Sequence, residues 1–199
     1  MSQETTPNES DWMKLDRAIR YVRYNLGSGL VLEAAGAGKE VTIDGYIDAA
    51  FGCHVDGKSH TGICVTLGRG PVHVRSAKQK IVTKSSTEAE LVGLSDEAGM
   101  VMGIANFVVL QGYVPMTRLC QDNMGAIAMI DNGRSTSLRT KHIKVRYFWL
   151  KEQLKADLRI VYIPTGKMIA DILTKPMQGA LFQRFVKLLC NRGDVVHSS

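Results

Sequence analysis

Four acidic side chains are spaced so that they can meet although they are far apart in the chain. Asp48 ends an alternating apolar segment and Asp122 directly follows another, while Glu90 lies one turn into a helical pattern and Asp171 lies in a short apolar segment near the C-terminus. Carboxylates this close repel one another unless divalent cations neutralise them. Mg²⁺ prefers oxygen ligands, and two such ions can clamp an in-line phosphodiester displacement. The set therefore predicts a two-ion phosphodiesterase site.

Each of these acids also has an ordinary structural interpretation. Asp48 suits a turn at a strand end, and Asp122 next to Asn123 suits an Asx turn. Glu90 and Asp171 suit solvated helix surfaces. Spacing alone leaves both interpretations open.

Composition limits the classes of protein that need to be considered. The chain has 199 residues, a net charge of +6 and a pI near 9.2, which suit one globular domain with a mild preference for a polyanionic partner. None of the 4 cysteines forms a C-x-x-C pair, so we expect reduced thiols and no zinc site. The polar start and the lack of a long apolar run predict no secretory leader and no membrane partner.

Hydrophobic periodicity predicts an α/β fold that positions these acids. After an N-terminal helix capped by Ser10 or Asp11 and a short strand at 30–32, three strands precede a helix whose capping box pairs Ser85 with Glu88. The expected strands are 41–48, 62–67, 72–76, 117–120 and 158–163, and the expected later helices are 124–130, 141–154, 169–173 and 181–189. Short connections make the first three strands antiparallel, so a mixed sheet flanked by helices follows.

The residues around the acids carry a family resemblance. Five blocks occur in order: Gly45-Tyr46-Ile47-Asp48-Ala49; Lys78-Gln79-Lys80 with Ser85-Ser86-Thr87-Glu88-Ala89-Glu90; Cys120-Gln121-Asp122-Asn123; Arg139-Thr140-Lys141-His142-Ile143 with Arg146-Tyr147; and Ala170-Asp171-Ile172-Leu173-Thr174-Lys175-Pro176. Together they resemble the ribonuclease H (RNase H) domain of copia-type LTR retrotransposon polyproteins over roughly 41–191. The first helix is similar to the segment that links reverse transcriptase to this domain.

The resemblance implies a function and a fold. The fold would be RNase H-like, a five-stranded mixed sheet with three antiparallel strands followed by parallel ones. The activity would be hydrolysis of the RNA strand of RNA–DNA hybrids with two Mg²⁺ ions, or Mn²⁺ as a substitute, giving 5′-phosphate and 3′-hydroxyl ends. Asp48 would bridge both ions, Glu90 and Asp122 would complete one site, and Asp171 the other.

Two choices and two departures accompany this assignment. The matching motif selects Asp48 over Asp44, and Glu88 is the expected capping residue, which leaves Glu90 as the ligand. The family often has a second acid two residues after the first, where this chain has Ala50. Cellular ribonucleases H carry a histidine in the loop that corresponds to 164–168, which has none here. A substitute role for His142 stays open beside capping or packing.

Substrate contacts are expected from polar and basic residues near the motifs. The predicted substrate-binding residues are Gln79, Lys80, Ser86, Asn123, Lys141 and His142. Two basic stretches, Arg69, Arg75, Lys78, Lys80 and Lys84, and Arg139, Lys141, Lys144 and Arg146, are either phosphate-binding surfaces or solvated basic faces. Phosphate contacts would make hybrid binding fall steeply with salt.

The expected partners are an RNA–DNA hybrid and the reverse transcriptase of the same polyprotein, in a cytoplasmic virus-like particle. The predicted domains are a tail and connecting helix at 1–38, the nuclease domain at 39–192 and a tail at 193–199. Three alternatives remain: a catalytically weak or inactive connection domain that binds nucleic acid, an integrase or transposase core, and a structural interaction domain.

Overall fold

The computed structural model describes residues 7–27, 29–34, 36–132, 141–154 and 158–191, with residues 132, 141 and 142 described for their backbone only. The chain forms two compact units, Met1–Leu30 and Val31–Ser199. The predicted domain boundaries at 38 and 192 stay predictions.

The first unit is built around helix α1, Glu9–Tyr24, none of whose residues is buried. Its N-cap is Asn8, whose side chain accepts from the backbone N–H of Asp11 while the Asp11 carboxylate accepts from the backbone N–H of Asn8. This reciprocal capping box begins the helix earlier than predicted, so the expected cap at Ser10 or Asp11 is wrong.

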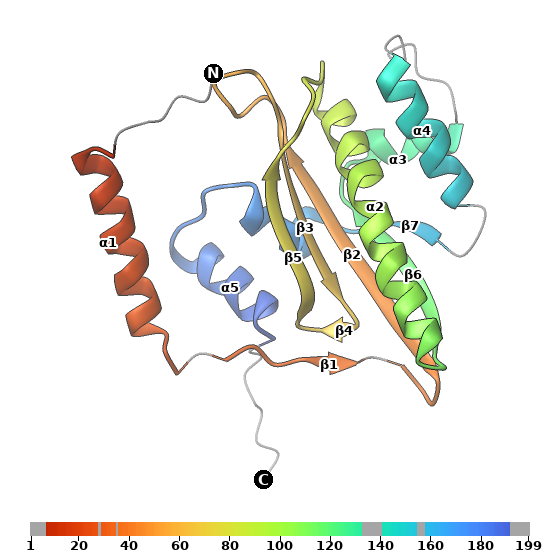
Figure 1. The fold of residues 1–199 in the computed structure, drawn as a ribbon, viewed down its shortest axis with the longest axis horizontal. Coiled ribbons are helices and arrows are strands. Elements are labelled where there is room, and N and C mark those ends of the chain that lie inside the picture. The colour runs from red at the N-terminus through yellow and green to blue at the C-terminus, as the bar shows by residue number, and fades with distance from the viewer. Residues whose placement is uncertain (1–6, 28, 35, 133–140, 155–157, 192–199) are drawn as a thin grey trace. The chain divides into compact units, whose positions relative to one another are not determined.

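The second unit contains the sheet and the remaining helices (Figure 1). Its elements are β1 Glu33–Ala34, β2 Glu40–Ala50, β3 His60–Thr66, β4 Gly68–Arg69, β5 Pro71–Lys78, α2 Ser86–Leu110, β6 Val114–Gln121, α3 Met124–Asn132, α4 Lys141–Gln153, β7 Leu158–Tyr162, the 3₁₀ turns η1 Thr165–Lys167 and η2 Ile169–Leu173, and α5 Gly179–Leu189.

The five-stranded sheet has the order β5-β3-β2-β6-β7. The β2–β3 and β3–β5 pairs are antiparallel, and the β2–β6 and β6–β7 pairs are parallel. This confirms the predicted mixed sheet. The short strand expected at 30–32 lies instead at Glu33–Ala34, where β1 pairs with β4.

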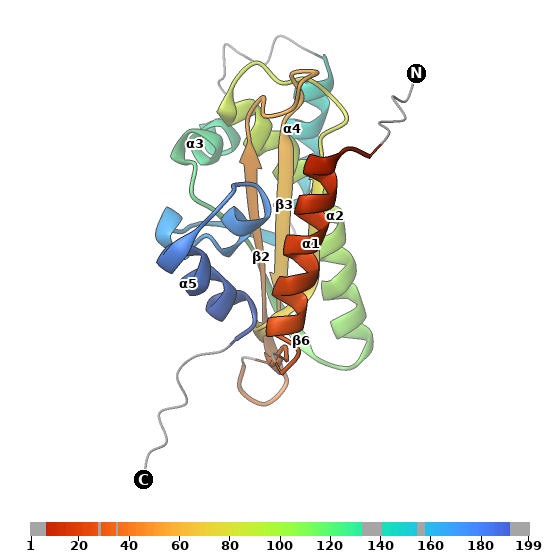
Figure 2. The same cartoon turned by 90° about the vertical axis from the view of Figure 1, so that its left-hand side faces the viewer.

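Helices and turns cover both faces of the sheet. Ile43 and Ile47 of β2 face a core that α2 and α4 complete, whereas Tyr46 of the same strand joins a smaller cluster with residues of η2 and α5. Figure 2 shows α2 and α5 on opposite sides of β2 and β3. This is the predicted alternation of β2, since successive side chains of a strand point to opposite faces.

Helix α2 begins as the capping motif predicted. Ser85 is the N-cap and its hydroxyl accepts from the backbone N–H of Glu88, while the Glu88 carboxylate accepts from the backbone N–H of Lys84, one residue beyond the expected partner. By length and composition α2 is apolar enough to cross a membrane, and half of its most apolar window is buried inside the protein.

Glycines allow the layers to approach closely at two positions. A Cβ on Gly45 of β2 would lie 2.7 Å from Cγ2 of Val101 on α2. A Cβ on Gly62 of β3 would lie 2.7 Å from Cβ of Leu173 and 3.0 Å from the carbonyl oxygen of Ala170. Only a glycine lets η2, which carries Asp171, rest directly on the sheet.

Candidate metal centre

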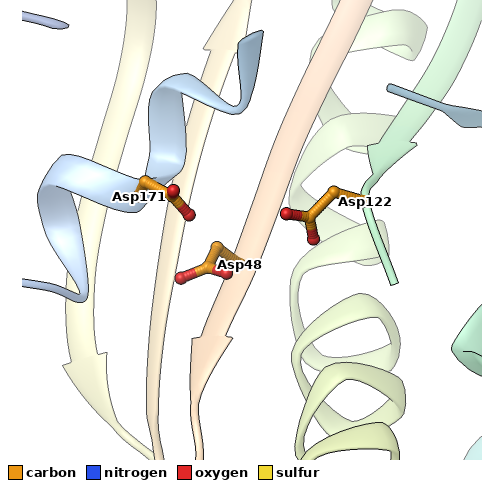
Figure 3. A group of neighbouring side chains, drawn as sticks. All are labelled: Asp48, Asp122 and Asp171. Atoms are coloured by element: carbon orange, nitrogen blue, oxygen red, sulfur yellow. The ribbon is translucent and has the colours of Figure 1, made fainter. Parts of the chain in front are cut away.

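Three of the four predicted acids converge at one edge of the sheet. One carboxylate oxygen from each of Asp48, Asp122 and Asp171 lies within 4.8 Å of the others. Figure 3 shows the three side chains turned toward a common space, with Asp171 and Asp122 on opposite sides of Asp48 in this view. Asp48 and Asp171 are buried, and Asp122 is half-buried.

Sheet geometry explains why these residues meet. Strands β2 and β6 run parallel with Tyr46 opposite Cys120, so Asp48 and Asp122, each two residues further along, arrive at the same edge. Asp171 comes from η2, which packs against β3 beside them. The sequence predicted a helix over 169–173 that carries Asp171, and the segment is a short 3₁₀ helix with these bounds. Asp48 and Asp122 could be placed at strand ends from the sequence, and the carboxyl ends of parallel strands lie at the same edge of a sheet.

Glu90 lies beside this cluster but outside the 4.8 Å group. Its carboxylate accepts from Nε2 of Gln121 at 3.1 Å, and it is 5% exposed. Burial, followed by the negative charge of Asp48, raises the pKa of Glu90 to about 8. The Glu88 carboxylate instead accepts from the backbone N–H of Lys84 at the start of α2. Glu90, and not Glu88, therefore lies beside the three aspartates.

A lysine that the sequence analysis did not select lies in the cluster. Nζ of Lys175 donates to Oδ1 of Asp171 at 2.7 Å and to Oδ1 of Asp48 at 3.2 Å. The Thr174 hydroxyl donates to the other carboxylate oxygen of Asp48. The sequence feature that could have indicated Lys175 is its spacing of four residues from Asp171, which suits an ion pair across a helical turn.

Burial and charge act in opposite directions on Asp171 and Lys175. Burial raises the pKa of Asp171 to about 6, although the hydrogen bond from Lys175 lowers it. Burial alone would lower the pKa of Lys175, but its hydrogen bond to Asp171 and the charge of Asp48 together raise it. The two groups therefore form a hydrogen-bonded ion pair inside the cluster.

Asp122 is held by the loop that follows β7. The Thr165 hydroxyl donates to Oδ2 of Asp122 at 2.7 Å. This loop was expected to correspond to the histidine-bearing loop of cellular ribonucleases H, and it brings a neutral hydroxyl to the carboxylate. The side chain of His142, the suggested substitute, lies outside the described residues, so its role stays a prediction.

The donor set fits a hard divalent cation. All candidate ligands are carboxylate oxygens, which Mg²⁺ and Mn²⁺ accept and softer ions favour less. Ligand oxygens on opposite sides of one Mg²⁺ ion are about 4.2 Å apart. The observed spread of up to 4.8 Å is therefore close to what one or two ions need.

The predicted substrate-binding residues occupy different environments. Gln79 is 4% exposed, and its Nε2 donates to Oγ1 of Thr61 and to the carbonyl oxygen of Ala89, so both amide protons are used within the protein. Asn123 caps α3, because its Oδ1 accepts from the backbone N–H of Ala126. Lys80 and Ser86 are exposed. The Lys141 side chain lies outside the described residues, and all these substrate roles stay predictions.

Several cations of the predicted basic stretches are paired with acids. Arg75 bonds to Glu97, Lys78 lies 2.8 Å from Asp56, and Arg69 lies 3.8 Å from Glu33. In the second stretch Arg146 lies 2.6 Å from Asp96. The two pairs whose partners are both exposed, Lys78–Asp56 and Arg69–Glu33, contribute little to stability. All four acids lower the local positive charge without removing the basic surface. Arg139 lies outside the described residues.

A chain of hydrogen bonds supports the segment that carries Asp171. The Ser76 hydroxyl donates to the carbonyl oxygen of Leu173 at 2.7 Å and therefore accepts from Nε2 of His60, also at 2.7 Å. Nδ1 of His60 is then the acceptor for Nε2 of His54 at 3.0 Å. Sequence reasoning missed these residues, because nothing in their spacing indicates a contact with residue 173.

Comparison with known proteins identifies relatives of the chain. It is 33% identical over 184 residues to the retrovirus-related Pol polyprotein from transposon RE2 of Arabidopsis thaliana, covering 90% of this chain and 12% of the relative. It is 29% identical over 196 residues to that of transposon TNT 1-94 of Nicotiana tabacum, covering 97% and 14%. It is 27% identical over 147 residues to the transposon Ty1-DR5 Gag-Pol polyprotein of Saccharomyces cerevisiae, covering 73% and 8%. The homologues of this chain are thus copia-type and Ty1 retrotransposon Pol polyproteins.

The chain spans about 12% of the length of the RE2 polyprotein that it matches. No protein-family model matches it. Among solved structures it is similar to RNase H1 from Halobacterium salinarum NRC-1, with a TM-score of 0.47 and 18% identity, covering 67% of this chain and 93% of that one. It is also similar to LC11-RNase H1 in complex with an RNA/DNA hybrid, with a TM-score of 0.47 and 20% identity, covering 66% and 92%.

Proposed function

We propose that this Pol segment is a ribonuclease H that hydrolyses the RNA strand of RNA–DNA hybrids during retrotransposon reverse transcription. The observation that carries the proposal is the convergence of Asp48, Asp122 and Asp171, with buried Glu90 beside them. These are the four acids that the family resemblance predicted as ligands. The proposed setting is a cytoplasmic virus-like particle, with the reverse transcriptase of the same polyprotein as partner.

The carboxylates would hold two Mg²⁺ ions, which supply an activated water and stabilise the departing 3′ oxygen. Asp48, the central acid, would contact both ions. Asp122 and Glu90 would complete one position, and Asp171 the other. Thr165 and Thr174 orient Asp122 and Asp48 through their hydroxyls. Such support keeps ligands in place and tunes their affinity for the ion.

Recognition of the hybrid would rest on its backbone and groove shape. Exposed Lys80 and the paired but accessible Arg75 and Lys78 suit phosphate contacts. Glu90, close to the reacting position, would contact the 2′-hydroxyl that distinguishes RNA from DNA. The products would carry 5′-phosphate and 3′-hydroxyl ends.

A catalytically weak or inactive connection domain is the second candidate. The observation that favours it is Lys175, which already neutralises Asp48 and Asp171 with a protein cation. Such a domain would bind nucleic acid without needing Mg²⁺. The two candidates differ in one measurable property, which is cleavage.

The test is cleavage of an end-labelled RNA–DNA hybrid with Mg²⁺ by the wild-type chain and by Asp122→Asn. We expect cleavage by the wild type, its loss in EDTA, and a loss of at least about a hundredfold for the variant. Asp131→Asn, which changes an exposed acid of α3, is the matched control and should cleave normally. Equal activity of Asp122→Asn and wild type would contradict the assignment of Asp122.

An inactive wild-type chain calls for a second measurement. Cleavage of the same hybrid would then be measured with the chain fused to its upstream reverse transcriptase, which can provide additional contacts with the hybrid. Inactivity of that fusion, with hybrid binding retained in EDTA, would favour the connection domain.

A further inference from the structure

Lys175 differs from the acids around it because it is a protein cation placed where a metal ion would be expected. Its ammonium contacts Asp171 at 2.7 Å and Asp48 at 3.2 Å, and both carboxylates are nearly inaccessible, with 6% and 2% of their side chains exposed. Two buried anions facing each other need a countercharge. Here the lysine supplies it.

The lysine covers only one side of the cluster. Its contacts are with Asp48 and Asp171, whereas Asp122 is bonded to Thr165 and Glu90 to Gln121. Figure 3 places Asp171 and Asp122 on opposite sides of Asp48 in this view. The Asp171 side of Asp48 carries an ammonium group, whereas the partners given above for Asp122 and Glu90 are a neutral hydroxyl and a neutral amide.

The ammonium group of Lys175 can move away from the carboxylates while the backbone of the residue stays in place. Its backbone N–H donates to the carbonyl oxygen of Asp171 at 2.9 Å, which fixes the residue at the end of η2. The side chain is 43% exposed, so the ammonium has a path to solvent. A lysine stem has four flexible carbons, and its compact charge is easily rehydrated.

We propose that Lys175 is a tethered cation that occupies the Asp48–Asp171 ion position in the metal-free protein and competes with a divalent ion there. This inference rests on the proposed function, because it assumes that the carboxylates bind divalent ions. The position between Asp48 and Asp122 fills first. The position between Asp48 and Asp171 fills only when the ammonium swings out, so the second ion binds more weakly than the first.

The test is titration with Mn²⁺, with free ion measured by electron paramagnetic resonance, of the wild type, Lys175→Met and Lys175→Arg. We expect two binding steps in the wild type, and a second step that is about tenfold tighter or more in Lys175→Met, as for a typical coupling between competing ligands. Lys175→Arg keeps the charge and should keep the weak second step. Lys39→Met, which removes an exposed lysine that precedes β2, is the control and should bind as the wild type does.

Thermal unfolding in EDTA gives an independent readout that needs no ion. Without its countercharge the Asp48–Asp171 pair should destabilise metal-free Lys175→Met by a few degrees, and Mn²⁺ should restore more stability to this variant than to the wild type. If Lys175→Met does not fold, a second step in Lys175→Arg as tight as the first would overturn the proposal.

The outcomes separate this inference from the proposed function. Two-step binding that is unchanged or weakened in Lys175→Met overturns the competition while leaving the nuclease proposal intact. A folded wild-type chain that binds no Mn²⁺, with or without hybrid, overturns both. Tighter binding by Lys175→Met supports the competition even if no cleavage is detected.

Discussion

Asp44 and Asp48 lie on the same face of the same strand, and both are buried, yet their partners differ. Asp44 receives two hydrogen bonds from the guanidinium of Arg118, at 2.6 and 2.7 Å. Asp48 faces other acids and is bonded to Thr174 and Lys175. A two-point arginine pair has fixed geometry, whereas a lysine on a flexible stem can be displaced. The comparison teaches that the partner, more than burial, separates a structural carboxylate from a candidate ligand.

The sharpest way to break this comparison is to neutralise each aspartate in turn. Asp48→Asn should lower hybrid cleavage by about a thousandfold or more, because it removes the acid shared by both ion positions. Asp44→Asn should retain cleavage per folded molecule but lose about 1–3 kcal/mol of stability, since Arg118 is left with a weaker partner. Initial cleavage rates and urea unfolding measure the two effects.

The opposite results for the two variants would contradict the assignment of Asp48 as a ligand and of Asp44 as a structural residue. Normal cleavage by Asp48→Asn, or loss of Mn²⁺ binding in a folded Asp44→Asn protein, would show that the two carboxylates have been assigned the wrong way round. Replacing Arg118 with Met is the matched control for the structural pair, and it should resemble Asp44→Asn in both measurements.

The second largest effect concerns pH. The pKa of Glu90 is about 8 in the metal-free fold and near 4.5 in an unfolded chain. Its contribution to stability is therefore present below pH 4.5 and is lost as pH rises through about 8. Ion binding needs the ionised carboxylate, so Mg²⁺ affinity should rise with pH by up to about tenfold per unit below that value.

Calorimetric titration of Mg²⁺ between pH 6 and pH 9, in buffers of different ionisation enthalpy, measures both the affinity and the released protons. Glu90→Gln should release fewer protons and flatten the pH profile. A wild-type affinity that does not change with pH would remove Glu90 from the set of ligands. Glu88→Gln should keep the wild-type profile, because that carboxylate accepts from the backbone N–H of Lys84 instead.

The parts of the site that could be predicted are those fixed by regular structure. Alternation along β2, a local pattern in the sequence, predicts the face on which Asp48 lies. The parallel pairing of β2 with β6, which brings Asp122 to the same edge, is a long-range contact that the sequence analysis did not specify. The capping box at Ser85 distinguished Glu88 from Glu90. The order of the strands along the chain followed from periodicity, while the family resemblance selected the catalytic acids, including Asp48 over Asp44.

The parts that could not be predicted depend on side chains meeting across long separations. Thr174 contacts Asp48 across 126 residues, and Ser76 contacts Leu173 across 97. No periodicity encodes such contacts, because they depend on how η2 rests on the sheet, and that in turn depends on a glycine.

A third prediction tests this dependence on Gly62. In Gly62→Ala the new methyl group would meet Cβ of Leu173 at 2.7 Å and must push η2 away from β3. Asp171 moves with η2, so Mn²⁺ affinity should fall several-fold and stability should fall by about 1–3 kcal/mol. Gly99→Ala, on an open part of α2 where nothing lies within 4 Å, should be neutral or slightly stabilising. Unchanged binding in a folded Gly62→Ala protein would show that the position of η2 does not control the cluster.

The smallest expected effect distinguishes packing from hydrogen bonding as the support of η2. Ser76→Ala removes the hydroxyl that joins His60 to the carbonyl oxygen of Leu173 while leaving the glycine contact intact. One net hydrogen bond contributes about 0.5–1.5 kcal/mol, so stability should fall by that amount at most, and cleavage and Mn²⁺ affinity should fall less than in Gly62→Ala. Ser76→Thr keeps the hydroxyl and should recover most of the loss. A larger loss for Ser76→Ala than for Gly62→Ala would mean that the histidine chain, rather than the close approach of η2 to the sheet, holds Asp171 beside Asp48.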